Sequence, residues 1–175
     1  MVDACMRCLN ATGYINFRMR AMLISFACHQ LQISWKQASP HLAHQFLDFE
    51  PGIHYPQVQM QAGVTGTNTI RIYNPVKQSM DQDPEGDFIR QWCSELADLP
   101  QQVIHQPWNL TNMEKQMYAL DYPDPIIDIK ASYKRARDQL WTWRKRPQVK
   151  QESSRILARH VRPDQDRFKR GAQKN

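Results

Sequence analysis

Two cysteines near the beginning of the sequence have the spacing of a redox or metal site. Cys5 and Cys8 form a C-x-x-C pattern, which can supply a disulfide-exchange pair or half of a zinc site. Cys28 and Cys93 are scattered, and no second C-x-x-C or H-x-x-x-H follows. Because the flanking pattern is helical, we predict buried helix cysteines and no metal, with metal or redox chemistry as the alternative.

The basic C-terminal part is a second candidate for function. From Lys130 onward the sequence has 15 lysine and arginine residues against 4 acidic ones, whereas the residues before it have 8 against 13. A cationic segment attracts polyanions, so DNA, RNA and anionic membranes are candidate partners, and a solvated terminus without a partner is the alternative. Four tryptophans could stack on bases, but their places in amphipathic helices favour core anchors. They are Trp92, Trp108, Trp141 and Trp143.

These groups must be positioned mainly by helices, because apolar residues recur at helical intervals along much of the chain. We predict helices over residues 16–35, 40–49, 83–96 and 131–145. Ser39 and Pro40 are expected to start the second of them, and Pro147 to stop the last. The predicted fold class is therefore mainly α.

Two further segments are expected to lack regular structure. Residues 52–74 are rich in glycine, threonine and asparagine, so we predict a long polar loop, a kind of segment that is usually functional in compact domains. Residues 149–175 are basic and weakly amphipathic, so we predict a frayed or disordered tail.

Length and hydropathy limit the class of protein. The 175 residues suffice for one domain with a hydrophobic core. No segment has the run of about 18 apolar residues that a membrane-spanning helix needs, and residues 1–7 show no secretory signal. We therefore predict a cytoplasmic protein without membrane association.

Nine short motifs occur in a fixed order between residue 2 and about residue 130. They are V-D-A-C-M-R at 2–7, T-G-Y at 12–14, R-M-R at 18–20, S-W-K at 34–36, F-L-D at 46–48, R-I-Y-N-P at 71–75, D-F-I-R-Q-W at 87–92, H-Q-P-W at 105–108 and D-Y-P at 121–123. Each is weak alone, but the ordered set resembles the helical FAD-binding domain of DNA photolyases and cryptochromes. The resemblance implies the C-terminal half of that domain over residues 1–129, followed by a basic helical or disordered segment over 130–175.

The resemblance also implies what the sequence lacks. Family members begin with an α/β antenna-binding domain and the first half of the helical domain, which holds the FAD pyrophosphate. The sequence here starts at the V-D-A motif and has no glycine-rich phosphate loop. We therefore expect a fragment or one half of a split protein, whose partner would be a chain supplying the N-terminal half.

FAD is the cofactor that the resemblance implies. In the family, light excites a reduced flavin, which passes an electron to a pyrimidine dimer in DNA. Arg20 and Asp48 match the pair beside the isoalloxazine ring, with a ligand-free salt bridge as the alternative. Glu50 matches an acidic residue whose backbone reaches the ring. His54 falls near the position that faces flavin N5, where it could donate a hydrogen bond, and a loop histidine without a ligand is the alternative.

The DNA side of the site is also assigned by resemblance. Arg18 and Arg71 match positions that approach DNA phosphates, with solvent-exposed arginines as the alternative. Met60 replaces the tryptophan that stacks on the dimer. Trp35 matches the middle tryptophan of the electron-transfer chain, with a core position as the alternative. Val58 stands where the flavin-proximal tryptophan is expected, so the resemblance implies a relay that is broken at its first step.

Three functions follow from the sequence. The first is an FAD-binding protein of the photolyase and cryptochrome type, inactive as an enzyme without the missing part, acting in DNA repair or blue-light sensing. The second is a flavin-free DNA-binding or interaction module, supported by the basic region. The third is a non-functional truncated remnant.

Overall fold

A computed structural model of the chain describes residues 1–65, 68 and 70–160. Within this part of the chain the elements are helices and their connections, without strands, as the mainly α prediction required. In chain order they are α1 (Val2–Thr12), α2 (Phe17–Ser25), the π-helix η1 (Phe26–Gln30), α3 (Trp35–Ala43), α4 (Pro51–Gln61), α5 (Pro75–Gln82), α6 (Asp87–Trp92), the 3₁₀ turn η2 (Ser94–Leu96), α7 (Gln101–Ile104), the 3₁₀ turn η3 (Pro107–Asn109), α8 (Asn112–Met117), α9 (Ile129–Lys145) and α10 (Pro147–His160).

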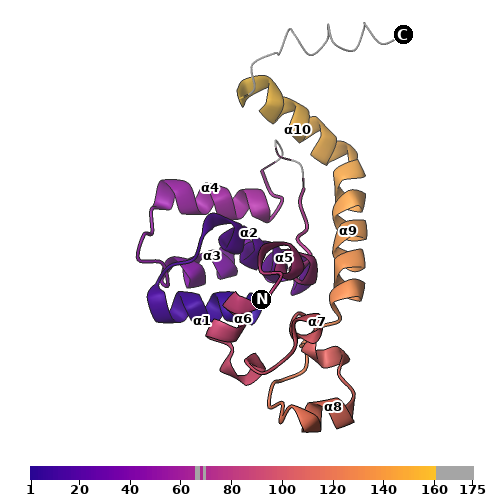
Figure 1. Ribbon diagram of the computed structural model, residues 1–175. Helices are drawn as coiled ribbons and strands as arrows, with labels where there is room; N and C mark the ends of the chain where they lie inside the picture. Colours follow the sequence, from indigo (N-terminus) through magenta and orange to yellow (C-terminus); the bar gives the residue numbers. More distant parts are fainter. Residues whose placement is uncertain (66–67, 69, 161–175) are drawn as a thin grey trace, which may run out of the picture.

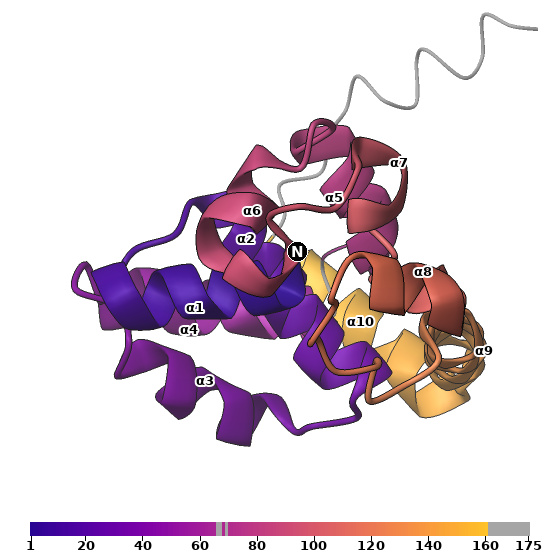
Figure 2. The ribbon, with the colours of Figure 1, turned by 60° about the horizontal axis from the view of Figure 1, so that its bottom comes forward.

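Two neighbouring hydrophobic clusters form the core. The first lies among α1, α2, α3 and α4 and includes Leu9, Met22 and Val58. The second joins α1 to the segments after α5 through residues such as Ile89 and Ile104. Figures 1 and 2 show α1 and α6 side by side, with α2 to α4 on one side of the body. The first cluster therefore holds together the helices that carry most of the predicted site.

Helices α9 and α10 lie at the edge of this body (Figure 1). One face of α9 buries Ser132 and Ala136, and the Nη2 of Arg135 donates a hydrogen bond of 3.1 Å to the Gln30 carbonyl in η1. Helix α10 buries none of its residues. The body thus anchors α9 along one face and leaves the rest of this helix pair to solvent.

The prediction of one helix over 16–35 is wrong in its last five residues and in the type of helix over residues 26–30. The α-helical ladder changes to a π-helix at Phe26, this π-helix ends at Gln30, and Gln32 then has a left-handed φ of 60°. Trp35 instead begins α3, and the hydroxyl of Ser34 caps that helix by accepting from the Lys36 N–H at 3.3 Å.

The expected start of the next helix is also corrected. Ser39 is not an N-cap and Pro40 is not a first helical residue, because both lie inside α3, which has already begun at Trp35. The helix ends at Ala43, so residues 44–49 form a connection and not a helix. This connection carries Asp48.

Two segments expected to be irregular are partly helical. Residues 51–61 form α4, so the polar loop is confined to the residues after it, of which Gly66, Thr67 and Thr69 lie outside the described residues. Residues 147–160 form α10, which corrects the prediction of a frayed segment there, and residues 161–175 lie outside the description. The helix predicted over 131–145 is confirmed as α9. The described helices include none that is both long enough and apolar enough to cross a lipid bilayer.

Candidate functional site

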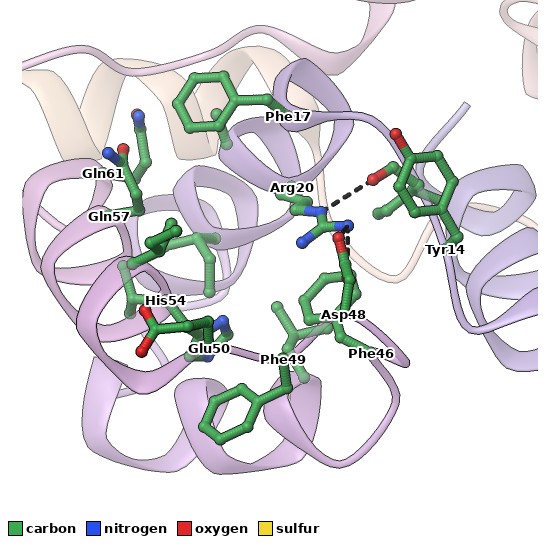
Figure 3. A pocket seen from close by; sticks show the side chains of 16 residues that line it. Tyr14, Phe17, Arg20, Phe46, Asp48, Phe49, Glu50, His54, Gln57 and Gln61 are labelled. Atoms are coloured by element: carbon green, nitrogen blue, oxygen red, sulfur yellow. Dashed lines mark hydrogen bonds and ion pairs between the residues drawn. The ribbon is translucent and has the colours of Figure 1, made fainter.

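A cavity of about 260 Å³ opens between α2, α4 and the connection from α3 to α4 (Figure 3). It is lined by Tyr14, Ile15, Phe17, Arg20, Ala21, Ile24, Leu42, Phe46, Asp48, Phe49, Glu50, Ile53, His54, Gln57, Val58 and Gln61. Pockets that enclose whole drug-sized ligands measure roughly 300–1,000 Å³. A cavity of this size and mostly apolar lining suits a planar ring system better than an entire dinucleotide.

Each helix presents one face to the cavity. The lining residues of α2 are Phe17, Arg20, Ala21 and Ile24, and those of α4 are Ile53, His54, Gln57, Val58 and Gln61. Both sets follow the spacing of three and four residues that places side chains on one side of a helix. Packing between α2 and α4 therefore fixes two walls of the cavity.

Arg20 and Asp48 meet at one end of this cavity (Figure 3). The Arg20 Nη2 donates to both carboxylate oxygens of Asp48, at 2.9 and 2.8 Å, and its Nε donates to the Ile15 carbonyl at 2.8 Å. The guanidinium carbon lies 4.0 Å from the centre of the Phe46 ring, a cation–π contact. The two charged side chains are thus brought together as predicted, although Asp48 comes from a connection and not from a helix.

The turn at Gly13 helps to position Asp48 beside Arg20. Gly13 ends α1 with a left-handed φ of 69°, which disfavours other residues, and a Cβ there would collide with the Leu47 side chain. The Leu47 N–H donates to the Gly13 carbonyl at 3.0 Å. This hydrogen bond fixes Leu47, the residue before Asp48, next to the connection between α1 and α2. The same connection contains Ile15, whose carbonyl accepts the hydrogen bond from Arg20.

His54 lies in the wall of the cavity but directs one nitrogen away from it. Its Nε2 is 3.0 Å from the carbonyl oxygen of Ser39 and 3.0 Å from the hydroxyl of the same residue. A carbonyl only accepts hydrogen bonds, so Nε2 must carry the hydrogen, and in the neutral ring Nδ1 is then an acceptor. The expected donation from His54 to a cofactor is consequently restricted to the protonated ring.

Glu50 lines the cavity at the start of α4. It is exposed, and its carbonyl accepts from the His54 N–H at 2.8 Å as the first turn of the helix forms. Its side chain makes no capping hydrogen bond. The carboxylate is therefore not committed to capping the helix beside the cavity.

Gln57 is a lining residue that the sequence interpretation missed. Its Oε1 is buried and has no hydrogen-bond partner in the described part of the chain. Leaving such an acceptor unpaired costs about 1–3 kcal/mol. The spacing of Glu50, His54, Gln57 and Gln61 could have revealed this wall, but the segment was interpreted as a loop.

The remaining predicted residues do not line this cavity. Arg18 is exposed on α2 and borders a neighbouring hollow with Met19 and Gln78. Arg71 is exposed in the connection before α5, and Met60 is half-buried on α4. Trp35 is partly buried and packs against the first core cluster.

The two cysteines of the C-x-x-C pattern are buried on α1, as predicted. Burial raises the pKa of the Cys5 thiol to about 12, which disfavours the reactive thiolate. No group of three or more metal-ligating side chains comes together among the described residues.

Comparison with known proteins defines the class of this protein. The family described as the FAD binding domain of DNA photolyase matches residues 1–142. The deoxyribodipyrimidine photo-lyase of Escherichia coli is 38% identical over 147 residues, which cover 78% of the chain and 30% of that protein. The cryptochrome DASH of Natronomonas pharaonis is 35% identical over 136 residues, covering 75% of the chain and 29% of that protein.

Solved structures agree with this class. A cryptochrome from Synechocystis superposes with a TM-score of 0.73 at 32% identity, over 77% of the chain and 29% of that structure. A photolyase from Sulfolobus tokodaii, solved with two FAD molecules, superposes with a TM-score of 0.68 at 29% identity, over 79% of the chain and 31% of that structure. The protein therefore belongs to the photolyase and cryptochrome family, within its FAD-binding domain, and spans about a third of the length of these relatives.

The residues of the cavity fit one part of FAD. Apolar walls suit the isoalloxazine ring, the cation of Arg20 suits its electron-rich edge, and the unpaired Gln57 Oε1 suits the ring N–H. The diphosphate is matched less well, because Arg20 is the one lysine or arginine in the lining and is already paired with Asp48. The lining therefore fits the ring of FAD, whereas a diphosphate would require residues from outside the cavity.

Proposed function

We propose that this chain forms the ring-binding part of the FAD site in a photolyase- or cryptochrome-like protein. Further protein residues, from the same polypeptide or from a second chain, would hold the diphosphate and adenosine. The observation that carries the proposal is the Arg20–Asp48 ion pair at one end of an apolar cavity whose wall also includes Gln57, a side chain with a buried, unpaired amide oxygen.

Each side chain of the site has a distinct role in this proposal. Arg20 supplies a permanent positive charge, and Asp48, Ile15 and Phe46 hold its guanidinium in one orientation. Glu50 and His54 border the ring position, with His54 presenting Nδ1 as an acceptor while its ring is neutral. When bound, the flavin supplies light absorption and electron donation, which in the photolyase family split pyrimidine dimers in DNA.

DNA contacts complete the proposed activity. Arg18 is an exposed cation on α2 and Arg71 is an exposed cation in the connection between α4 and α5, so both are available to phosphate groups. Met60 offers an apolar surface where a base could lie.

The relay of tryptophans that feeds electrons to the flavin is proposed to be interrupted. Trp35 is kept as its middle member, but Val58, which is buried in the cavity wall, cannot be oxidised in place of a tryptophan. A neighbouring aromatic, Tyr55, is 37% exposed and lies edge-on to His54 at 5.4 Å between ring centres. We therefore propose that the flavin is reduced mainly by external reductants.

Reconstitution of the FAD site tests the proposed function. The chain is co-expressed with the part of the Escherichia coli photolyase that lies outside the region of similarity, and flavin absorbance is measured in the purified complex. Flavin should co-purify with the wild-type pair and fall at least ten-fold with Arg20→Ala, whereas Arg18→Ala, on the same helix but outside the cavity, should retain it. Flavin binding that survives Arg20→Ala unchanged would contradict the assignment.

A repair assay separates flavin binding from chemistry. The reconstituted, chemically reduced complex is illuminated with an oligonucleotide that carries a cyclobutane pyrimidine dimer. Restoration of the dimer to two pyrimidines would support repair. Bound flavin without repair under these conditions would restrict the proposal to light sensing.

A further inference from the structure

A stripe of positive charge with one tryptophan in its middle runs along the exposed face of α9. Its members are Lys130, Lys134, Arg137, Trp141 and Arg144. They follow one another at intervals of four, three, four and three residues, which keeps them on one side of a helix. We call this set the α9 stripe.

Most of the α9 stripe faces away from the body of the protein, although Arg144 is half-buried and Lys130 also borders a hollow beside Trp108. The residues that α9 buries, Ser132 and Ala136, lie on the opposite face. Lys130, Lys134 and Arg137 are exposed, and Trp141 is 57% exposed. The prediction that Trp141 and Trp143 are core anchors is therefore wrong, because α9 extends past the core at this end. An indole in this position gains free energy when a partner removes its apolar surface from water.

The charge around the stripe is almost entirely of one sign. Residues 129–160 contain 10 lysine and arginine residues and only 2 acidic ones, Asp138 and Glu152. Both acids already pair with arginines, Asp138 with Arg137 at 2.9 Å and Glu152 with Arg155. The surface of the helix pair is thus complementary to a polyanion.

We propose that the α9 stripe is a docking site for single-stranded nucleic acid, in which the cations track phosphates and Trp141 stacks on a base. The stripe extends over 15 residues, whose 14 steps of 1.5 Å span about 21 Å, enough for several nucleotides. A duplex would use the charges but would offer Trp141 no unstacked base. A membrane would require an apolar face turned outward, whereas the face that α9 presents is cationic.

This site is separate from the proposed flavin site. None of the stripe residues lines the cavity between α2 and α4, and the DNA contacts proposed there come from Arg18, Arg71 and Met60. Binding at the α9 stripe requires neither flavin, light nor a lesion, so the two proposals can fail independently.

Fluorescence anisotropy with the full chain tests the inference. The probe is a fluorescein-labelled, undamaged oligothymidylate of about 12 nucleotides, titrated in the dark and without flavin at several salt concentrations. Lys134→Gln should weaken binding and reduce the slope of log affinity against log salt by about 0.7, as expected for one phosphate contact. Lys36→Gln, an exposed lysine on α3, is the matched control and should change neither quantity.

Substitutions of the exposed tryptophans distinguish stacking from charge. Trp141→Ala should weaken binding by about 5- to 150-fold, as for loss of one base–aromatic stack, and Trp141→Phe should restore most of it. Trp143→Ala removes a tryptophan that is 45% exposed but lies outside the stripe, so its effect should be less than about two-fold. Circular dichroism checks that each variant stays folded.

Three results would overturn the proposal. The first is equal loss of affinity with Trp141→Ala and Trp143→Ala, or no loss with either. The second is binding to the matching duplex as tight as to the single strand. The third is stronger binding to vesicles of phosphatidylserine and phosphatidylcholine than to the oligonucleotide.

Discussion

The Nε2 of His54 lies 3.0 Å from the carbonyl oxygen of Ser39, and this contact determines which nitrogen of the ring carries hydrogen. The bond connects α3 to α4 behind the cavity. Phe46 and Phe49 hold the same ring by edge contacts, with centres 5.8 and 5.4 Å away. The side chain is therefore fixed both in orientation and in tautomer.

We predict that neutral His54 is the Nε2–H tautomer, which nitrogen-15 NMR of the ligand-free chain at alkaline pH can measure. Ser39→Ala removes the hydroxyl but keeps the carbonyl, so the tautomer should persist in this variant. A spectrum dominated by the Nδ1–H form would show that the Ser39 carbonyl does not control the ring.

The ion pair of Arg20 and Asp48 is predicted to contribute little to folding. Their side chains are 24% and 49% exposed, and pairs this accessible typically add about 0.2–1 kcal/mol to stability. Asp48→Asn should therefore lower the free energy of unfolding by less than about 1 kcal/mol in urea titrations. A loss of several kcal/mol would mean that the pair is structural, which is the alternative to a ligand-binding role.

Acid should remove a second ion pair that links α1 to η2. Arg7 donates to Glu95 through two nitrogens, each at 2.8 Å. These bonds lower the pKa of Glu95 from 4.5 to about 2. The contribution of this ion pair to folding stability is therefore complete above about pH 4.5 and is lost as the pH falls toward 2.

Glu95→Gln tests this contribution. The variant should be less stable than the wild type near neutral pH, by about 1 kcal/mol or less because the pair is solvent-accessible. The difference in stability between the two proteins should shrink as the pH falls from about 4.5 toward 2. A difference that stays constant across that window, in thermal unfolding followed by circular dichroism, would contradict the role of the carboxylate charge.

From its position under α4, His29 gives a pH dependence of the same sign as that of Glu95 but at higher pH. It is 3% exposed, and its Nε2 lies 2.9 Å from the Gln61 carbonyl oxygen. Burial lowers the pKa of His29, although this hydrogen bond opposes the shift. The unfolded chain therefore takes up the proton first, and stability should fall as the pH drops below the ordinary value of 6.5.

Replacing His29 with glutamine should weaken this dependence. His29→Gln keeps an N–H that can donate to Gln61 but cannot titrate in this range. The melting temperature of the variant should change less than that of the wild type between about pH 6.5 and 5. Equal slopes for the two proteins would exclude His29 as the titrating group.

The sequence predicted the parts of the fold that depend on regular apolar spacing. Helix α9 was found within two residues, because Pro147 and the periodic pattern mark its end clearly. Helix α4 was missed because Pro51, Gly52 and Pro56 suggest a loop. Pro51 instead occupies the first helical turn, where it needs no hydrogen-bond donor.

The candidate site was predictable in its charges but not in its shape. The pairing of Arg20 with Asp48 came from ordered motifs, whereas the cavity depends on how α2 packs on α4, which no local pattern specifies. The unpaired oxygen of Gln57 and the orientation of His54 toward Ser39 are likewise tertiary features. The exposure of Trp141 was missed because periodicity gives the face of a helix but not how far the core extends beneath it.

Riboflavin binding to the isolated chain tests most directly whether the cavity beside Arg20 and Asp48 holds the flavin ring. Riboflavin carries the ring without the diphosphate, so its fluorescence should be quenched on titration with the protein, and ADP should not compete. Arg20→Ala should weaken this binding, while Arg18→Ala should leave it unchanged. A folded wild-type chain that binds ADP but not riboflavin, or that binds riboflavin equally well after Arg20→Ala, would contradict the account.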